Sequence, residues 1–379
     1  MLCLGLMSGT SADGVDAVLA DFRGRSERPD WQLIRHQHCP YAEDLQHQLV
    51  ATGQGTPLSA EAWLELAEAV TEAQAAAARA CDPDGTAELV GCHGQTLWHR
   101  PPANGRRGAS WQVLQGPLLA RLLERSVVHD FRAADLALGG QGAPLVPRAD
   151  AALMGGIDGW RALLNLGGIA NLTLIPPRCG PDQNAPVRGW DCGPANTLID
   201  LAMQRFSEGR IRFDLDGRAA AAGECREDWI SRWLTEPYFQ EDPPKSTGRE
   251  RFGADDLERR LTDLSGLRPE DAIATLTGFS AAVVGQDLDR LQRQEGIRPL
   301  ELVVAGGGRR NPSLMAALRR RCHGLQLLSS DSLGLPAEAR EALVFALLAW
   351  WHHKGQPANA PAITGAARET LLGVRVEPA

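Results

Sequence analysis

The strongest constraint on the fold is a pattern that occurs twice in the chain. An apolar run, a short turn of small residues and a second apolar run make up LCLGLMSGTSADGVDAVLADF, residues 2–22. The same order recurs in WRALLNLGGIANLTLIPP, residues 160–177. Apolar runs of strand length on either side of small turn residues predict a β-hairpin. Each hairpin leads a stretch of alternating helices and strands, so the chain is predicted to be an internal duplication of an α/β domain.

The length of 379 residues favours two domains, because single cores rarely grow that large. We place the first domain at residues 1–135 and the second at 136–379, with the crossover near the glycine-rich loop GGQGAP, residues 139–144. The apolar segment 337–354 predicts a buried helix that could pack back across the interface. Two related domains that face one another would form a cleft between them.

The composition excludes several classes of partner. A net charge of −8 argues against nucleic acid or an anionic membrane as the main partner. The longest apolar run, Ala342 to Trp351, is about half the length that a membrane-spanning helix needs. The eight cysteines include no C-x-x-C pair, so neither a zinc site nor a redox pair is indicated. Scattered thiols fit a reducing compartment, and we expect a cytoplasmic protein.

The opening turn, SGTSADGVD at residues 8–16, fails two familiar tests for nucleotide loops. Gly9 and Gly14 have the spacing of a P-loop, but Val15 and Asp16 stand where Lys and Ser or Thr are required. The turn also lacks G-x-G-x-x-G and leads into a strand, so it is not a dinucleotide fingerprint. What remains is a hairpin tip that is either a plain turn or a cradle whose N–H groups bind phosphate.

Two further segments raise the same question. LNLGGIAN, residues 164–171, is a second tip of small residues, and two such tips could clamp a polyphosphate. AGGGRRN, residues 305–311, follows a predicted strand and precedes a predicted helix. Its bare backbone would let a ribose or a planar group pack closely. For both segments the alternative is an ordinary turn or flexible loop.

Three side chains could carry chemistry, and each has an ordinary structural alternative. Asp191, before a predicted helix, is either a cap or a general base. His93 in HGQT and Arg132 in DFR each follow the end of a predicted strand, where α/β folds place ligand contacts. Arg132 could pair with an anionic substrate group, or it could form a surface ion pair.

Together these segments resemble one family closely, the anhydro-N-acetylmuramic acid kinases of the actin/hexokinase/Hsp70-like ATPase superfamily. The resemblance extends over most of the chain and is weak at about residues 20–85 and after residue 355. It rests on eight motifs in the family's order: LGLMSGTSADGVD (4–16), HGQT (93–96), DFR (130–132), GGQGAPLVP (139–147), LNLGGIAN (164–171), RGWDCGPAN (188–196), PKSTGRE (244–250) and AGGGRRN (305–311).

The resemblance implies a duplicated actin/hexokinase-like, ribonuclease H-like fold with the active site in the cleft between two domains. It implies that Asp191 is the catalytic base and that ATP and Mg²⁺ are required. The implied ATP-binding residues are Gly9, Thr10, Ser11, Ala12, Asp13, Gly14, Val15, Asp16, Asn165, Gly167, Gly168, Gly306, Gly307 and Gly308. The implied substrate-binding residues are His93, Gln95, Arg132 and Gly193, and the candidate metal ligands are Asp13 and Asp16.

The implied reaction opens the anhydro bridge of 1,6-anhydro-N-acetylmuramic acid with water and phosphorylates O6. The products would be N-acetylmuramic acid 6-phosphate and ADP, in recycling of cell-wall sugar, and a homodimer is conceivable. Two alternatives remain: a kinase of the same superfamily that acts on a different sugar or carboxylate, and an ATP-regulated binding protein without turnover.

Overall fold

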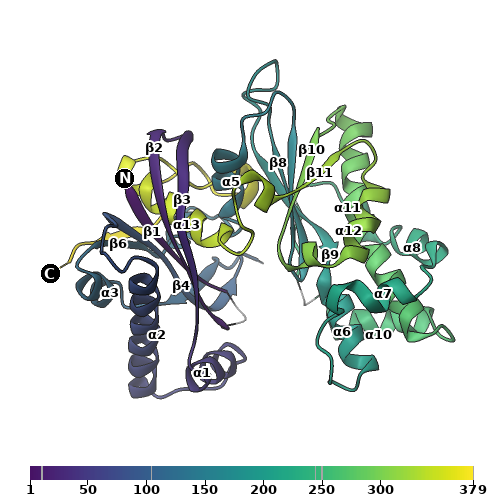
Figure 1. Ribbon diagram of the computed structural model, residues 1–379, viewed down its shortest axis with the longest axis horizontal. Helices are drawn as coiled ribbons and strands as arrows, with labels where there is room; N and C mark the ends of the chain where they lie inside the picture. The colour runs from purple at the N-terminus through teal and green to yellow at the C-terminus, as the bar shows by residue number, and fades with distance from the viewer. Residues whose placement is uncertain (10–11, 104, 244, 249–250, 379) are drawn as a thin grey trace. The chain divides into compact units, whose positions relative to one another are not determined.

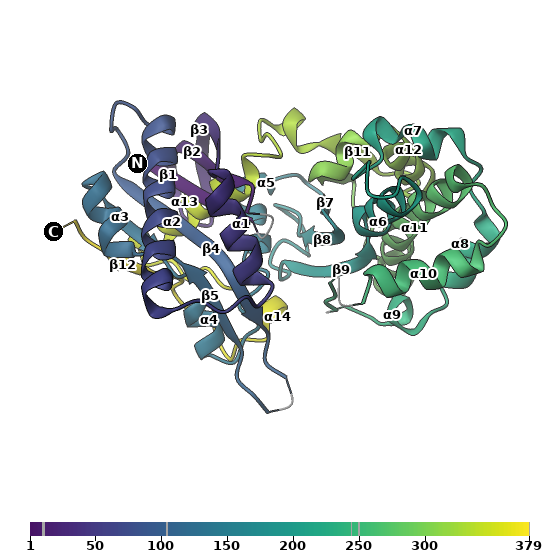
Figure 2. The ribbon, with the colours of Figure 1, turned by 90° about the horizontal axis from the view of Figure 1, so that it is seen from below.

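The computed structural model describes residues 1–9, 12–103, 105–243, 245–248 and 251–378. It divides into two compact units, Met1–Met154 together with Gly334–Ala379, and Gly155–Leu333 (Figures 1 and 2). The segments 136–154 and 334–379, expected in the second domain, therefore belong to the first unit. Among the described residues, no helix is both long and apolar enough to cross a membrane.

The first unit is built on a mixed sheet in the order β12-β6-β4-β1-β2-β3, with β5 added beside β4. Pairs β1–β2 and β2–β3 are antiparallel, whereas β1–β4 and β4–β6 are parallel. The strands are β1 Leu2–Ser8, β2 Gly14–Arg25, β3 Arg28–Pro40, β4 Leu89–Arg100, β5 Ala109–Val113, β6 Ser126–His129 and β12 Val374–Val376. The helices are α1 Glu43–Gly53, α2 Ala60–Cys81, α3 Gly116–Leu123, α4 Ala133–Ala137, α5 Val146–Met154, α13 Arg340–Lys354 and α14 Pro361–Thr364.

The two faces of this sheet are covered differently because side chains alternate along β1. Leu4 and Leu6 are buried in a core cluster that includes residues of α2. Gly5 lies on the opposite face, where an added Cβ would stand 1.9 Å from the carbonyl oxygen of Ala342 in α13. Gly91 of β4 meets α13 in the same way, 2.1 Å from the carbonyl oxygen of Phe345. The backbone of α13 therefore lies close against the backbone of the sheet, which is possible because Gly5 and Gly91 have no side chains.

The second unit repeats the strand order of the first. Its sheet runs β9-β8-β7-β10-β11, with the first two pairs antiparallel and the last two parallel. The strands are β7 Arg161–Leu166, β8 Ile169–Ile175, β9 Arg188–Pro194, β10 Glu301–Ala305 and β11 Gln326–Ser329. The helices are α6 Asn196–Phe206, α7 Arg218–Ala222, α8 Glu227–Trp233, α9 Pro237–Gln240, α10 Ala254–Asp263, α11 Pro269–Glu295 and α12 Pro312–Arg321. Short 3₁₀ turns are η1 Leu215–Gly217, η2 Gly307–Arg310 and η3 Ser330–Leu333.

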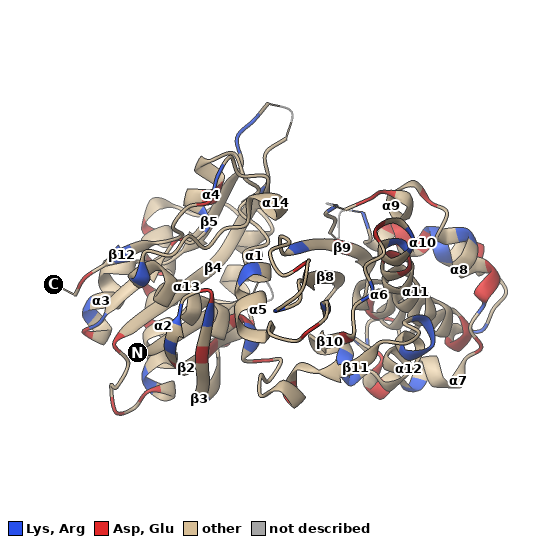
Figure 3. Cartoon of the chain, turned by 90° about the horizontal axis from the view of Figure 1, so that it is seen from above, with Lys and Arg blue, Asp and Glu red and all other residues tan. Residues whose placement is uncertain are grey.

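The shared order of β3-β2-β1-β4-β6 and β9-β8-β7-β10-β11 confirms the predicted α/β class and shows the duplication directly. Both predicted hairpins are present, as β1–β2 and β7–β8. Asn311 caps α12 by accepting from the Leu314 N–H at 3.1 Å, as its position before Pro312 predicts. Helices α8 and α10 each carry both acidic and basic residues (Figure 3).

One local prediction was wrong, and one was refined. HGQT does not follow a strand end, because β4 continues through it to Arg100. Gly94 has φ +76°, and this irregularity lets β4 shift register against β1 and continue beside β5. Asp191 lies inside strand β9, ahead of α6 as expected, and it does not cap that helix. Gly189 and Gly193 flank a Trp-Asp-Cys segment there. Because glycine has a low strand propensity, the sequence does not indicate a strand at this position.

Candidate active site

The tip of the first hairpin is closed by side-chain hydrogen bonds. The Ala12 N–H donates to the Gly9 carbonyl at 3.1 Å and makes the turn. The Ser8 hydroxyl lies 2.8 Å from the Gly14 carbonyl and 2.5 Å from Gln95 Oε1, and its one proton serves either acceptor. Gln95 Nε2 in turn donates to the Gly9 carbonyl at 2.9 Å. Gln95, from the neighbouring strand β4, therefore holds the start of the turn at Ser8 and Gly9, and Ser8 reaches Gly14 at its end.

The ATP-binding residues predicted in this tip have different surroundings. Thr10 and Ser11 lie outside the described residues. Ala12 and Val15 are 2% and 1% exposed, so only their main chain could reach a phosphate. Asp13 is exposed, and Gly14 packs against β3, where an added Cβ would meet the Cys39 carbonyl at 2.4 Å. The described part of the tip thus presents one exposed carboxylate, which would need a cation to lie beside a phosphate, and phosphate binding at this turn stays a prediction.

Asp16 lies near the start of β2, and its carboxylate contacts two histidines of β3. His36 Nε2 lies 3.0 Å and His38 Nδ1 lies 3.2 Å from the same oxygen, Asp16 Oδ1. No group of three or more His, Cys, Asp or Glu side chains in the described part of the chain could hold a metal ion. Mg²⁺ usually keeps several waters and takes only one or two carboxylates besides substrate phosphates. Asp13 and Asp16 would be the two carboxylates of such an ion, and their role as metal ligands stays a prediction.

His93 and Arg132 form a second part of the site in the first unit. His93 is 3% exposed, and its Nδ1–H donates to the Gly94 carbonyl at 2.9 Å. Its Nε2 is therefore the acceptor for Arg132 Nη2 at 3.2 Å. Burial, reinforced by the Arg132 charge, lowers the pKa of His93 to about 3. A neutral His93 orients Arg132 and does not itself carry charge or transfer protons near neutral pH.

Arg132 is further fixed by the glycine-rich loop after α4. Its Nη1 donates to the Gly142 carbonyl at 2.7 Å, while the Gly142 N–H donates to the buried carboxylate of Asp135 at 2.8 Å. Arg132 Nε is buried without a hydrogen-bond partner among the described atoms. Burial lowers the pKa of Arg132, and the charge of Glu341 opposes that shift. A desolvated guanidinium with an unsatisfied N–H is a strong site for a carboxylate ligand.

Glu341, at the start of α13, is not among the predicted site residues. Burial raises its pKa, and the charges of Arg340 and Arg132 work in the opposite direction. The place of Glu341 in the sequence does not indicate that it lies near Arg132, because the two come together only when α13 packs against the sheet. A hollow of about 530 Å³ lies nearby in the same unit, lined by Pro102, Ala103, Gly105, Arg106, Arg107, Gly108, Leu136, Ala137 and Gly139.

The second hairpin tip and the triple-glycine loop come together in the second unit. Ala305 at the end of β10 pairs with Asn165 of β7. An added Cβ on Gly306 would stand 2.6 Å from Asn165 Oδ1, and one on Gly308 would stand 2.7 Å from Leu166 Cβ. The structure thus brings the predicted residues of LNLGGIAN and AGGG into direct contact. For Gly307, an added Cβ would meet no described atom within 4 Å, so this backbone is open to a ligand.

The same tip is joined to the start of α6. The carbonyls of Gly167 and Gly168 accept from the backbone N–H groups of Asn196, at 3.1 Å, and Thr197, at 3.1 Å. An added Cβ on Gly168 would meet the Thr197 hydroxyl at 2.6 Å. Gly167 and Gly168 therefore fix a rigid tip whose conformation is set by the helix rather than by the turn alone.

Asp191 lies in β9, and both oxygens of its carboxylate accept hydrogen bonds. Oδ1 accepts a hydrogen bond from Asn171 Nδ2 on the second hairpin. Oδ2 accepts from the Thr247 N–H at 2.8 Å and from the Ser246 hydroxyl at 3.2 Å. The sequence did not single out Asn171, Ser246 or Thr247 as partners of Asp191, because they become neighbours only when β8 and the segment 245–248 flank β9.

The other predicted substrate residue in this unit, Gly193, is buried. Its φ is +151°, and an added Cβ would stand 2.8 Å from Phe239 Cε1. The structure places Gly193 against the core, so a role in binding substrate stays a prediction.

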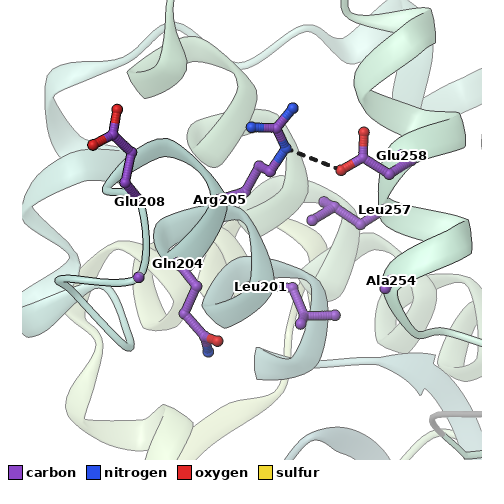
Figure 4. Close-up of a pocket in the computed structure, with 8 residues that line it drawn as sticks. Leu201, Gln204, Arg205, Glu208, Ala254, Leu257 and Glu258 are labelled. Atoms are coloured by element: carbon purple, nitrogen blue, oxygen red, sulfur yellow. Dashed lines mark hydrogen bonds and ion pairs between the residues drawn. The ribbon is translucent and has the colours of Figure 1, made fainter.

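The second unit also contains a cavity lined by other residues. A pocket of about 390 Å³ is lined by residues of α6 and α10, with an ion pair between Arg205 Nε and Glu258 Oε1 at 3.2 Å (Figure 4). Its α6 residues begin at Leu201, whereas the hairpin tip meets α6 at Asn196 and Thr197. The pocket is therefore separate from the Asp191 cluster.

Comparison with known proteins decides the family. The family model described as "Anhydro-N-acetylmuramic acid kinase" matches residues 1–378. The chain belongs to the anhydro-N-acetylmuramic acid kinase family. The protein of that name from Synechococcus sp. (strain CC9902) is 69% identical over 379 residues, which cover 100% of both chains. Those from Parasynechococcus marenigrum (strain WH8102) and Prochlorococcus marinus (strain MIT 9303) are 69% and 64% identical over the same length, with the same complete coverage.

Family membership makes the chain a kinase, a phosphotransferase, and confirms the resemblance drawn from the eight motifs. The hydrogen-bonded residues around Arg132 and those around Asp191 are therefore both parts of a kinase. One unit of this kinase carries the first hairpin and the His93–Arg132 pair, and the other carries the second hairpin, the triple glycine and Asp191.

Proposed function

We propose that this kinase uses ATP to open the anhydro bridge of 1,6-anhydro-N-acetylmuramic acid and to phosphorylate O6. The observation that carries the proposal is the hydrogen bond from Asn171 to Asp191. It ties the carboxylate directly to the second hairpin, the element that we assign to ATP phosphates. A general base is thereby fixed to the phosphate-binding element.

In the proposed reaction, Asp191 accepts a proton from the water that attacks the anomeric carbon. The bond between that carbon and O6 breaks, and the electron pair that O6 gains attacks the γ-phosphorus of ATP. ADP leaves, and the sugar has gained one water and one phosphoryl group. A single base can thus drive both bond changes, and phosphoryl transfer depends mainly on positioning and charge neutralisation.

We assign the remaining residues to binding. Gly9, Ala12, Asp13, Gly14, Asn165, Gly167, Gly168 and Gly306 to Gly308 would contact ATP, and Asp13 and Asp16 would face Mg²⁺, which supplies positive charge against the phosphates. Arg132, oriented by His93, would pair with the lactyl carboxylate that distinguishes muramic acid from glucosamine. Gln95 would act mainly by holding the first hairpin. The cytoplasm is the proposed compartment, and a homodimer would appear as a doubled mass in analytical ultracentrifugation.

The test is incubation with MgATP and 1,6-anhydro-N-acetylmuramic acid, followed by mass spectrometry of the sugar. The expected product has gained both water and phosphate. Release of ADP without that product would point to another sugar or carboxylate kinase, and nucleotide binding without turnover would point to a regulated binding protein.

Asp191→Asn tests the base. We expect kcat to fall by about 10²–10⁴-fold, because general-base catalysis typically contributes that factor. Binding of a non-hydrolysable ATP analogue should remain. Asp263→Asn is the matched control, since Asp263 accepts from Trp233 Nε1 at 2.8 Å in the same unit. Near-normal turnover in Asp191→Asn would refute the assignment.

A further inference from the structure

The second unit buries an ion pair beneath the strand that carries Asp191. Lys245 Nζ lies 3.0 Å from Asp287 Oδ1, and the two side chains are 2% and 3% exposed. Burial raises the pKa of Asp287, and the nearby Lys245 charge acts against that rise. Removing two charges from water costs free energy that their attraction often does not recover, so a buried ion pair adds little to the free energy of folding. A role in positioning other residues therefore explains this pair better than a role in stability.

Asp287 of α11 is hydrogen-bonded both to strand β9 and to the loop that contains residues 245–248. Its Oδ2 accepts from Trp190 Nε1 at 2.9 Å, and Trp190 precedes Asp191 in β9. Its Oδ1 accepts from Lys245 and also from Arg290 Nη1 at 3.1 Å. One carboxylate of α11 thus holds both the strand and the loop that flank Asp191.

Other side chains of α11 hold the chain that leads to the loop. Arg290 donates to the Phe239 carbonyl at 2.6 Å and to the Glu241 carbonyl at 2.7 Å. Gln286 Nε2 also donates to the Phe239 carbonyl, at 2.6 Å. These bonds involve the main chain, so they set the path of the loop whatever its side chains are.

The loop in turn grips Asp191 at its backbone and its carboxylate. The Asp191 N–H donates to the Lys245 carbonyl at 3.0 Å, and the Thr247 N–H donates back to Asp191 Oδ2 at 2.8 Å. The Ser246 hydroxyl adds a second donor to Oδ2 at 3.2 Å. The Lys245 side chain binds Asp287 while its neighbours Ser246 and Thr247 bind Asp191, so Lys245 links the residues that hold Asp191 directly to α11.

We propose that Lys245 is a positioning residue for Asp191: its ion pair with Asp287 fixes segment 245–247 against β9 and so holds the carboxylate in its reactive orientation. The proposal rests on the proposed function, in which Asp191 is the base. Lys245 Nζ binds Asp287 and does not serve as a phosphate contact. Without the ammonium group, the segment that carries Ser246 and Thr247 loses its ion pair with α11, so these two donors to Asp191 Oδ2 are held less firmly while the hydrogen bond from Asn171 remains.

The test compares Lys245→Met with Arg161→Met in the full-length chain. Arg161 forms a comparable ion pair with Glu301, at 2.5 Å between β7 and β10, with side chains 8% and 20% exposed. We expect Lys245→Met to lower kcat by about 10–100-fold, because small misplacements of a catalytic group have effects of that size. The KM for ATP should not change. Arg161→Met should lose thermal stability but retain kcat.

A structural readout accompanies the kinetics. Hydrogen exchange at the amides of Asp191 and Thr247 should accelerate in Lys245→Met and stay unchanged in Arg161→Met. Lys245→Arg, which keeps a cationic donor for Asp287, should restore most of kcat. If Lys245→Met does not fold, Lys245→Gln replaces it: its shorter, uncharged amide supplies at most a hydrogen bond to Asp287 in place of the ion pair, so kcat should lie below that of Lys245→Arg, and a kcat equal to the parent's would overturn the role of Lys245.

A double variant separates this inference from the proposed function. Lys245→Met should cost nothing further in an Asp191→Asn background, because the two residues act as one unit. An additional loss of similar size, or wild-type kcat in Lys245→Met beside an inactive Asp191→Asn, would overturn the role of Lys245 alone. Near-normal turnover in Asp191→Asn would instead remove the proposed base.

Discussion

His93 makes the stability of the first unit depend on pH in a direction that the structure fixes. An unfolded histidine has a pKa of about 6.5, whereas burial and Arg132 lower the pKa of His93 to about 3 in the folded protein. Between these two pKa values, His93 is protonated in the unfolded chain and neutral in the folded chain. This contribution to stability is complete above the unfolded pKa and is lost progressively as pH falls toward the folded pKa.

The size of the effect follows from the gap between the two values. Each pH unit below about 6.5 costs about 1.4 kcal/mol, so a change from about pH 7 to about pH 5 costs about 2 kcal/mol from this one group. His93→Gln removes the titration while leaving an amide that can face Arg132. The variant should be less stable than the parent near neutral pH, yet its stability should fall by about 2 kcal/mol less on acidification.

The assay is urea unfolding of the parent and the variant at both pH values. Pulsed hydrogen exchange with mass spectrometry of β4 peptides reads the first unit separately from the second, so a two-state treatment applies to each. All other titrating groups are shared by the two proteins and cancel in the difference. Equal losses of stability in parent and variant would refute a buried, neutral His93.

Three further outcomes follow from the same contacts. Arg132→Ala should raise the KM for the anhydro sugar by about 10–100-fold, the size of a lost charged hydrogen bond, with the KM for ATP unchanged; steady-state kinetics with each substrate varied will show whether the sugar KM moves. Gln95→Leu removes the donor to the Gly9 carbonyl and leaves the Ser8 hydroxyl with the Gly14 carbonyl as its acceptor, and it should weaken ATP binding by about 1–3 kcal/mol, which calorimetry can measure; unchanged affinity would contradict its role in the hairpin. Gly91→Ala should lower stability by about 1–3 kcal/mol, because the new methyl group meets α13 backbone; a denaturation midpoint equal to the parent's would show that α13 does not pack there.

The sequence determined the class of fold and the family, and the reason is local. Alternating apolar runs with small residues between them specify hairpins through short-range preferences, and both hairpins formed where the pattern placed them. Asn311 before Pro312 specified the start of α12 in the same local way. The eight motifs are likewise contiguous, so their order can be read along the chain.

The tertiary structure alone decided which residues act on one another. Asn171, Ser246 and Thr247 meet at Asp191 because two separate segments flank β9, and sequence spacing carries no record of that meeting. The continuation of β4 through HGQT depended on pairing with β5 beyond a glycine.

The same reason explains the C-terminal segment. α13 belongs with β1 and β4 although more than half of the chain separates them, because Gly5 and Gly91 leave a surface that only a closely packed helix can fill. Composition identifies α13 as a buried helix, but complementarity with a distant sheet determines where it is buried. That placement brings Glu341 to Arg132, just as Asp287 of α11 brings Lys245 to the loop that holds Asp191.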